Sequence, residues 1–290
     1  MFVRSIWDRF RGQRRRLAFQ ARLCLLLFAL PSAFALAGPS AEEAYRAGDH
    51  AAARAAYAER TDRGDFKAQV ALGHMLLKGE GGPADEELAI FHFTFACLAG
   101  EATALPPLQR LAADGSPAAI YSIGMLLENG DLLPKNFDAA VANYMRAAEA
   151  GHATAMNDIG SLYESGEGLP LDYGLAREWY ERAARAGSTT ALLNLGALFA
   201  QGKGVDRDPE LAAGLFIVAA KAGSAEAQFN LGRLYGKGEG VELDYVESFV
   251  WFKRAEAGGL EMAAPIAAAM AALLTADELR EAERRLEEGM

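Results

Sequence analysis

A glycine pattern that recurs at a fixed spacing constrains this chain of 290 residues more than any other feature. Five glycines, each preceded by Leu or Ile, mark its copies: Gly73, Gly124, Gly160, Gly196 and Gly232. The last four marker glycines are 36 residues apart, and the first lies 15 residues further away than this period allows. A further glycine stands six residues after each marker, and an aromatic residue stands twenty residues after it. A period of this length is typical of proteins that stack one small structural unit many times.

Each period predicts two helices. The first helix begins about seven residues before the marker glycine and ends about five residues after it, where glycines permit a tight turn. Twelve residues after the marker, an Asp or Asn caps the second helix, and these caps are Asp85, Asn136, Asp172, Asp208 and Asp244. The marker glycine itself lies inside a helix, where it costs about 1 kcal/mol relative to alanine. Its recurrence therefore indicates that the two helices approach closely.

One copy contains Gly202-Lys203-Gly204, which invites comparison with a phosphate-binding loop. Such a loop normally follows a buried strand and has Ser or Thr directly after its lysine. Neither feature is present, and the same glycines recur in other copies without the lysine. We interpret this segment as the end of a helix.

The whole-length pattern resembles the Sel-one-like repeat, a relative of the tetratricopeptide repeat. The copies that carry the resemblance best are ATAMNDIGSLYESGEGLPLDYGLAREWYERAARAG (153–187) and AEAQFNLGRLYGKGEGVELDYVESFVWFKRAEAGG (225–259). The resemblance covers roughly residues 40 to 275 and implies an all-α fold, a right-handed α-solenoid of antiparallel helix pairs with a concave groove. Members of the family are mostly adaptors that hold other proteins, and many bacterial members work in the cell envelope. Some cysteine-rich members are linked to β-lactam binding, but their paired cysteines are absent here.

The N-terminus has the three parts of a secretory signal. Residues 1–22 carry seven arginines and one acid, and the apolar run LCLLLFALPSAFALA follows, ending at Ala37. This run is shorter than the roughly 20 residues that span a bilayer. We expect a signal peptide over 1–37, cleaved after Ala37, and a periplasmic or secreted protein. The alternative is an uncleaved anchor in the inner membrane.

The rest of the chain divides into three parts. Residues 38–64 read as an N-terminal helix pair with Asp49 as a cap, and residues 65–259 hold the five repeats. An insertion at 101–115 interrupts the repeats, and its Pro106-Pro107 either breaks a helix or starts one. Residues 260–290 read as C-terminal capping helices, the last of which opens with a capping box at Thr275.

Charge and cysteine content narrow the classes of partner. The seven arginines and Asp8 contribute +6, so the chain from Gly38 onward carries −16 where the whole chain carries −10. A charge this negative argues against binding nucleic acid or an anionic membrane, and it favours basic partners kinetically. We expect contact with a membrane only through the N-terminal segment, if it is uncleaved. Cys97 is the only cysteine after the signal region, so we expect no internal disulfide and a buried thiol in an apolar helix.

The sequence offers little sign of catalysis. Its four histidines are His50, His74, His92 and His152, and they form no metal-binding cluster. His92 stands among apolar residues and is expected in the core. We therefore predict no catalytic residue, no cofactor and no metal site. The pairs Trp179-Tyr180 and Trp251-Phe252 could stack on a sugar, but they share one repeat position, so packing between repeats is the better interpretation.

In a stack of this kind the first helices line the groove. Positions three before, one after and four after the marker glycine lie opposite the predicted buried face. From these positions we predict a protein-binding groove formed by Tyr121, Met125, Asn157, Ser161, Leu193, Phe229 and Arg233. The apolar members would form an exposed strip, which usually marks a protein-binding surface. In an alternative arrangement, some side chains three before the marker tuck into the neighbouring repeat.

The sequence thus predicts a non-enzymatic scaffold or adaptor of the bacterial cell envelope that holds another envelope protein in its groove. Two alternatives remain open from the residues alone. One is an enzyme or ligand-binding protein that acts on cell-wall or polysaccharide material. The other is a membrane-anchored scaffold with an intact N-terminal helix.

Overall fold

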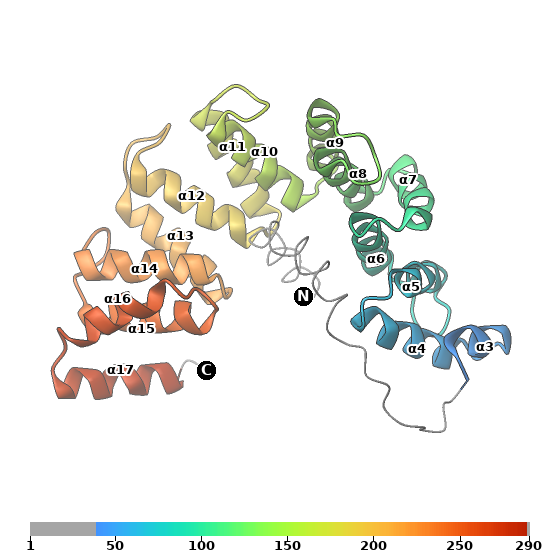
Figure 1. Ribbon diagram of the computed structural model, residues 1–290. Helices are drawn as coiled ribbons and strands as arrows, with labels where there is room; N and C mark the ends of the chain where they lie inside the picture. Colours follow the sequence, from blue (N-terminus) through green and yellow to red (C-terminus); the bar gives the residue numbers. More distant parts are fainter. Residues whose placement is uncertain (1–38, 289–290) are drawn as a thin grey trace. The chain divides into compact units, whose positions relative to one another are not determined.

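The computed structural model describes residues 39–288, and these form α-helices, one short 3₁₀ helix and connecting loops (Figure 1). They divide into two compact units at Ala150 and Gly151, here called the N-terminal unit and the C-terminal unit. An all-α helical repeat fold is therefore confirmed. The predicted signal segment at 1–37 lies outside the described residues. Within them, no helix is both long enough and apolar enough to cross a membrane.

The N-terminal unit contains the first two complete repeats and an additional helix pair. Its helices are α3 (Ala41–Arg46), α4 (His50–Asp62), α5 (Phe66–Lys78), α6 (Glu86–Leu98), η2 (Ala102–Ala104), α7 (Leu105–Ala113), α8 (Pro117–Asn129) and α9 (Phe137–Glu149).

The C-terminal unit contains the other three repeats and the capping helices. Its helices are α10 (Ala153–Ser165), α11 (Tyr173–Arg185), α12 (Thr189–Gln201), α13 (Pro209–Lys221), α14 (Ala225–Lys237), α15 (Tyr245–Ala257), α16 (Ala263–Ala271) and α17 (Ala276–Glu288).

The predicted helix limits are confirmed in all five repeats. Each first helix begins seven residues before its marker glycine and ends five residues after it, as α12 does around Gly196. The next residue, Gly202 in that repeat, has a φ of 68°, which lies in the left-handed region. Its backbone N–H donates to the carbonyl of Leu198 and closes the last turn. Gly202 and Gly204 thus end a helix, as the sequence predicted.

Both helices begin with a side-chain cap in every repeat except the second, where α8 starts without one. Each predicted Asp or Asn accepts a hydrogen bond from the backbone N–H three residues later, as Asp208 does from Leu211 at 2.9 Å. The caps of the first helices were not predicted, and they are provided by Asp65, His152, Ser188 and Ser224. All these caps satisfy backbone donors that a helix leaves unpaired at its start.

The marker glycines bring the two helices of a repeat into close contact. A Cβ added to Gly73 would lie 2.7 Å from the ring of Phe93, and one added to Gly196 would lie 2.7 Å from Phe216. In these two repeats the aromatic residue of the second helix therefore occupies the space that a side chain at the marker would need. The predicted close approach of the helices is confirmed.

Alanines and aromatic rings form most of the core. The alanine five before each marker glycine is fully buried, as Ala227 is in α14. Trp179 and Trp251 are each 8% exposed and carry the guanidinium groups of Arg182 and Arg254 over their rings. These rings are packed inside the structure, so the interpretation of the tryptophan pairs as packing is confirmed.

The parts outside the repeats also follow the predicted local signals. In the insertion, the prolines start a helix: Pro106 and Pro107 stand in the first turn of α7. Asp49 caps α4. Thr275 and Glu278 form the predicted capping box at α17, because each side chain accepts a hydrogen bond from the other residue's backbone N–H.

Candidate protein-binding site

The predicted groove residues do not share one environment. Positions are counted here from the marker glycine, so that position +1 is the next residue. At position −3, Tyr121 and Asn157 are each only 2% exposed. The prediction that these two side chains face a groove is therefore wrong. Asn157 follows the alternative in which position −3 contacts the neighbouring repeat, whereas Tyr121 packs within its own repeat.

Position −3 is buried because it faces neighbouring helices of the stack. The ring of Tyr121 packs against Tyr144 of α9, with the ring centroids 5.3 Å apart. Asn157 accepts a hydrogen bond of 3.0 Å from the side chain of Asn194, which belongs to the next first helix. Leu193 and Phe229 are half-buried and pack against the core of the C-terminal unit, Phe229 on the ring of Phe252.

A continuous apolar strip is therefore not formed. Of its four predicted members, Tyr121 is buried, Leu193 and Phe229 are half-buried in core contacts, and Met125 is half-buried at position +1. Position +1 is where the first helices remain accessible to solvent, because Ser161, Arg233 and His74 are exposed there. The accessible face is thus more polar than the sequence predicts.

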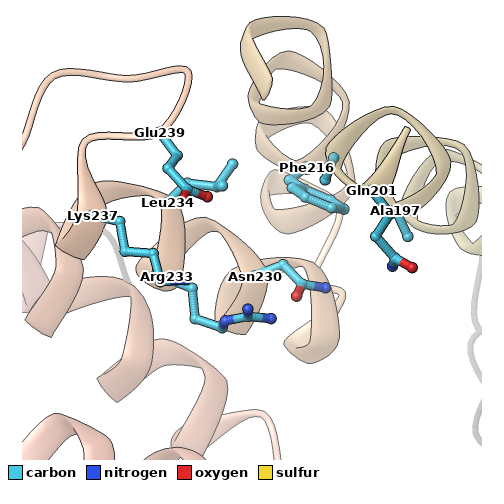
Figure 2. A pocket seen from close by; sticks show the side chains of 9 residues that line it. Ala197, Gln201, Phe216, Asn230, Arg233, Leu234, Lys237 and Glu239 are labelled. Carbon is cyan, nitrogen blue, oxygen red and sulfur yellow. The ribbon is translucent and has the colours of Figure 1, made fainter. Parts of the chain in front are cut away.

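A pocket of about 210 Å³ opens on this face in the C-terminal unit (Figure 2). It is here called the C-terminal pocket, and it lies between α12, α13 and α14. Its lining residues are Ala197, Ala200, Gln201, Phe216, Asn230, Arg233, Leu234, Lys237 and Glu239. Of the predicted groove residues, Arg233 lines it.

The pocket lies where its repeat lacks the glutamate that two other repeats carry at position +4. At position +4, the second and third repeats carry Glu128 and Glu164, which accept hydrogen bonds from the tyrosines of their own second helices at 2.5 and 2.8 Å. In the fourth repeat the aromatic residue is Phe216, which has no hydroxyl, and position +4 is Ala200. The space that a glutamate fills elsewhere is therefore open.

The charges in the C-terminal pocket are not balanced. Glu239 forms an ion pair of 3.2 Å with Arg207, a residue outside the lining. Within residues 39–288, neither Arg233 nor Lys237 forms an ion pair or a side-chain hydrogen bond. The pocket thus presents two cations that the described part of the protein does not neutralise.

A second pocket, of about 380 Å³, lies on the first-helix face of the N-terminal unit. It is here called the N-terminal pocket, and its lining residues are Tyr45, Tyr57, Ala71, His74, Met75, Lys78 and Glu80. Glu80 accepts a hydrogen bond from Tyr45 at 2.9 Å and forms an ion pair of 3.5 Å with Lys78. Partial burial of the ring, together with the Lys78 ammonium, lowers the pKa of His74, so this side chain is neutral at pH 7.

Both pockets are built from the same repeat positions. α5 and α14 each contribute positions −2, +1, +2 and +5, and the loop after each helix contributes a glutamate at +7. The aromatic wall also corresponds, because Tyr57 and Phe216 each stand eight residues after the Asp that caps their helix. Positions −2 and +5 were not predicted, although a lysine at +5 together with a basic or titratable residue at +1 occurs only in these two repeats.

Two further titratable groups have strongly shifted pKa values. Burial lowers the pKa of His92 to about 4 and raises the pKa of the Cys97 thiol to about 12. Both side chains are buried in the N-terminal unit, as predicted for them. Across residues 39–288, no group of three or more His, Cys, Asp or Glu side chains could hold a metal ion.

Comparison with known proteins identifies the repeat. The family model described as the Sel1 repeat matches residues 66–101, 117–152, 153–188, 189–224 and 225–260. The gap between the first two matches, residues 102–116, contains the predicted insertion at 101–115 except for its first residue. A search of curated proteins found no match. Proteins of this repeat are typically scaffolds for protein interactions.

Solved structures support the same assignment. A Sel1 repeat protein from Oxalobacter formigenes is 29% identical, with 75% of this chain and 84% of that chain covered and a TM-score of 0.50. A protective antigen of uropathogenic Escherichia coli strains, which displays an SLR fold, is 26% identical with a TM-score of 0.62. That match covers 86% of this chain and 61% of the antigen. Because the family model matches more than half of its residues, the chain belongs to the Sel1 repeat family.

Proposed function

We propose that this protein is a non-enzymatic scaffold of the bacterial cell envelope, which binds a segment of another envelope protein on its first-helix face. The observation that carries the proposal is the pair of pockets that the two units form from equivalent repeat positions. Repeats of this kind serve as interaction scaffolds, and a face used for binding needs accessible side chains on a rigid helical support.

The size of the C-terminal pocket favours side chains of a partner over a cofactor or a small substrate. Pockets for small molecules usually measure about 300–1,000 Å³. The C-terminal pocket, at about 210 Å³, is smaller than this range, and the N-terminal pocket, at about 380 Å³, is near its lower end. Each can hold one or two side chains of a peptide.

Location in the envelope is the second part of the proposal, and it rests on the sequence of residues 1–37. A basic region, a short apolar run and small residues before Gly38 are typical of a cleaved signal peptide. N-terminal sequencing of the protein from its native cells tests this directly. A mature chain that starts at Gly38 is expected, whereas a chain that retains residues 1–37 would favour the membrane-anchored alternative.

Photo-crosslinking in the native cells tests the binding role. A photoreactive residue is placed in turn at Gln201, which lines the C-terminal pocket, and at His74, which lines the N-terminal pocket. Arg185 on α11 is the control, because it is exposed and lines neither pocket.

A dominant protein adduct at Gln201 or His74 that is absent at Arg185 is expected. Equal labelling at all three positions, or no protein adduct at either pocket, would refute the proposal. Gln201 and His74 are better positions than Tyr121 for this purpose, because a photoreactive group at the buried Tyr121 would disrupt the packing against Tyr144.

A further inference from the structure

The chemistry of the C-terminal pocket narrows the kind of segment that it can hold. Arg233 and Lys237 are one helical turn apart on α14, and Asn230 precedes Arg233 by three residues, so the three side chains share one face of the helix (Figure 2). Gln201 of α12 lines the opposite side. All four side chains carry N–H donors, and the two cations have no anion to accept from them within the described residues.

Apart from Glu239, the rest of the lining is apolar. Ala197, Ala200, Phe216 and Leu234 contribute it, and Phe216 is 2% exposed. An ion pair formed against apolar groups is less screened by water than one on an open surface. Arginine also matches a carboxylate with two parallel hydrogen bonds, which gives direction as well as strength.

The one acid in the lining does not cancel this preference. Glu239 could in principle neutralise Arg233 or Lys237, but its carboxylate pairs with Arg207 at 3.2 Å. The pocket is therefore a basic site on a chain whose net charge is −10. The negative net charge of the chain favours basic partners overall. The C-terminal pocket, in contrast, favours an acidic group within the segment that the partner places there.

We propose that the C-terminal pocket binds the carboxylate of an Asp or Glu side chain in the partner segment, held by Arg233 and Lys237. A small apolar residue beside that acid packs on Ala197 and Ala200. This inference rests on the proposed scaffold function, and it names the chemical class of the segment that the scaffold holds.

A selection from random short peptides displayed on phage tests the inference, because it samples acidic and non-acidic segments alike. The intact protein is used as bait, in parallel with the charge-reversal variant Arg233→Glu/Lys237→Glu. The matched control is Arg185→Glu/Lys221→Glu, which makes the same change in net charge at exposed residues outside the pocket.

Peptides selected by the intact protein are expected to be enriched in Asp or Glu next to a small apolar residue. Changing that acid to Asn or Gln should raise the dissociation constant at least about tenfold, as loss of a charge-assisted hydrogen bond does. The pocket variant should lose at least this factor, because its two glutamates also repel the peptide's acid. The control variant should bind like the unchanged protein. In the pocket variant, replacing the peptide's acid should no longer weaken binding and should partly restore it, because the acid would otherwise face two glutamates of the same charge.

Several results would overturn the inference. Selected peptides without acidic residues would do so while leaving the scaffold function in place, and so would unchanged binding by the pocket variant. Binding of polygalacturonate, with no acidic peptide selected, would assign the site to an acidic glycan instead. If no peptide is selected and no adduct forms at Gln201 or His74, the scaffold function fails together with the inference.

Discussion

The N-terminal and C-terminal pockets have the same construction but different charge. In both, a first helix presents a basic or titratable residue at +1 and a lysine at +5, and a glutamate follows at +7. In the N-terminal pocket the glutamate, Glu80, pairs with the lysine of its own pocket at 3.5 Å. In the C-terminal pocket Glu239 pairs instead with Arg207, which belongs to the loop of the preceding repeat.

This difference shows that the repeat position of a residue determines where its side chain lies, but not whether a charged side chain forms an ion pair. Arg207 stands eleven residues after its marker glycine, where the third and fifth repeats carry Leu171 and Leu243. Glu239 pairs with that arginine, and Arg233 and Lys237 have no paired anion among the described residues. Binding chemistry in this fold can therefore change through a residue outside the pocket.

The largest expected difference between the two units is in their response to acid. His92 lies buried in the N-terminal unit, and burial lowers its pKa from 6.5 to about 4. As the pH falls below 6.5, the unfolded chain gains a proton on this residue that the folded chain takes up only near pH 4. Folding stability is therefore lost between these values, by about 3 kcal/mol in total.

Chemical denaturation at pH 7 and pH 4, followed by circular dichroism, measures this loss. His92→Leu should lose about 3 kcal/mol less than the unchanged protein over the same interval. In a chain that starts at Gly38, the fluorescence of Trp179 and Trp251 reports on the C-terminal unit alone and should change at lower pH than the helical signal. If His92→Leu and the unchanged protein lose the same free energy of unfolding between pH 7 and pH 4, burial of His92 does not make the N-terminal unit more sensitive to acid.

A smaller difference is expected in the helices that carry the pockets. An added Cβ at Gly73 in α5 would lie 2.7 Å from Phe93, whereas one at Gly232 in α14 would lie 3.2 Å from Phe252. Overpacking typically destabilises a protein by about 1–3 kcal/mol. Replacing glycine by alanine inside a helix offsets about 1 kcal/mol of this, because alanine has the higher helix propensity. Gly73→Ala should therefore destabilise the protein by up to about 2 kcal/mol, and Gly232→Ala by about zero.

Urea unfolding of the two variants side by side tests this prediction. Equal losses at both positions would mean that α14 packs on α15 as tightly as α5 packs on α6. In that case α14, which carries the C-terminal pocket, would not differ from α5 in how tightly its marker glycine is packed.

Most of the fold could be predicted because its signals are local. The marker glycine, the turn glycines and the capping Asp or Asn act on residues only a few positions away, so the limits of a helix such as α12 follow directly from them. The insertion shows the same principle, because the prolines at its centre start α7. The caps of the first helices were missed although Ser188 and Ser224 stand at equivalent positions, which is the signal that reveals them.

The binding site was harder to predict because it depends on contacts between helices. Tyr121 and Arg233 both belong to helix faces that look alike in sequence, yet Tyr121 packs against Tyr144 and Arg233 remains exposed. Helical spacing shows which side of a helix a residue is on, but the neighbouring helix decides how much of that side it covers. The pairing of Glu239 with Arg207, 32 residues away, has no periodic signal at all.

The smallest expected effect tests whether charge pairing alone separates the two pockets. Glu80→Gln removes the anion beside Lys78 and keeps an acceptor for the Tyr45 hydroxyl. In the Arg233→Glu/Lys237→Glu background, where only the N-terminal pocket is intact, this change should raise the affinity for a selected acidic peptide about twofold to threefold, the range of an exposed ion pair. Glu59→Gln is the control, because Glu59 is exposed and pairs with Arg63 outside the pocket. Titration with the peptide measures the affinity of both glutamine variants. If the two affinities are equal, charge pairing does not distinguish the pockets. The difference between them would then lie in the shape that the side chain of Tyr45 and the neutral ring of His74 give to the N-terminal pocket.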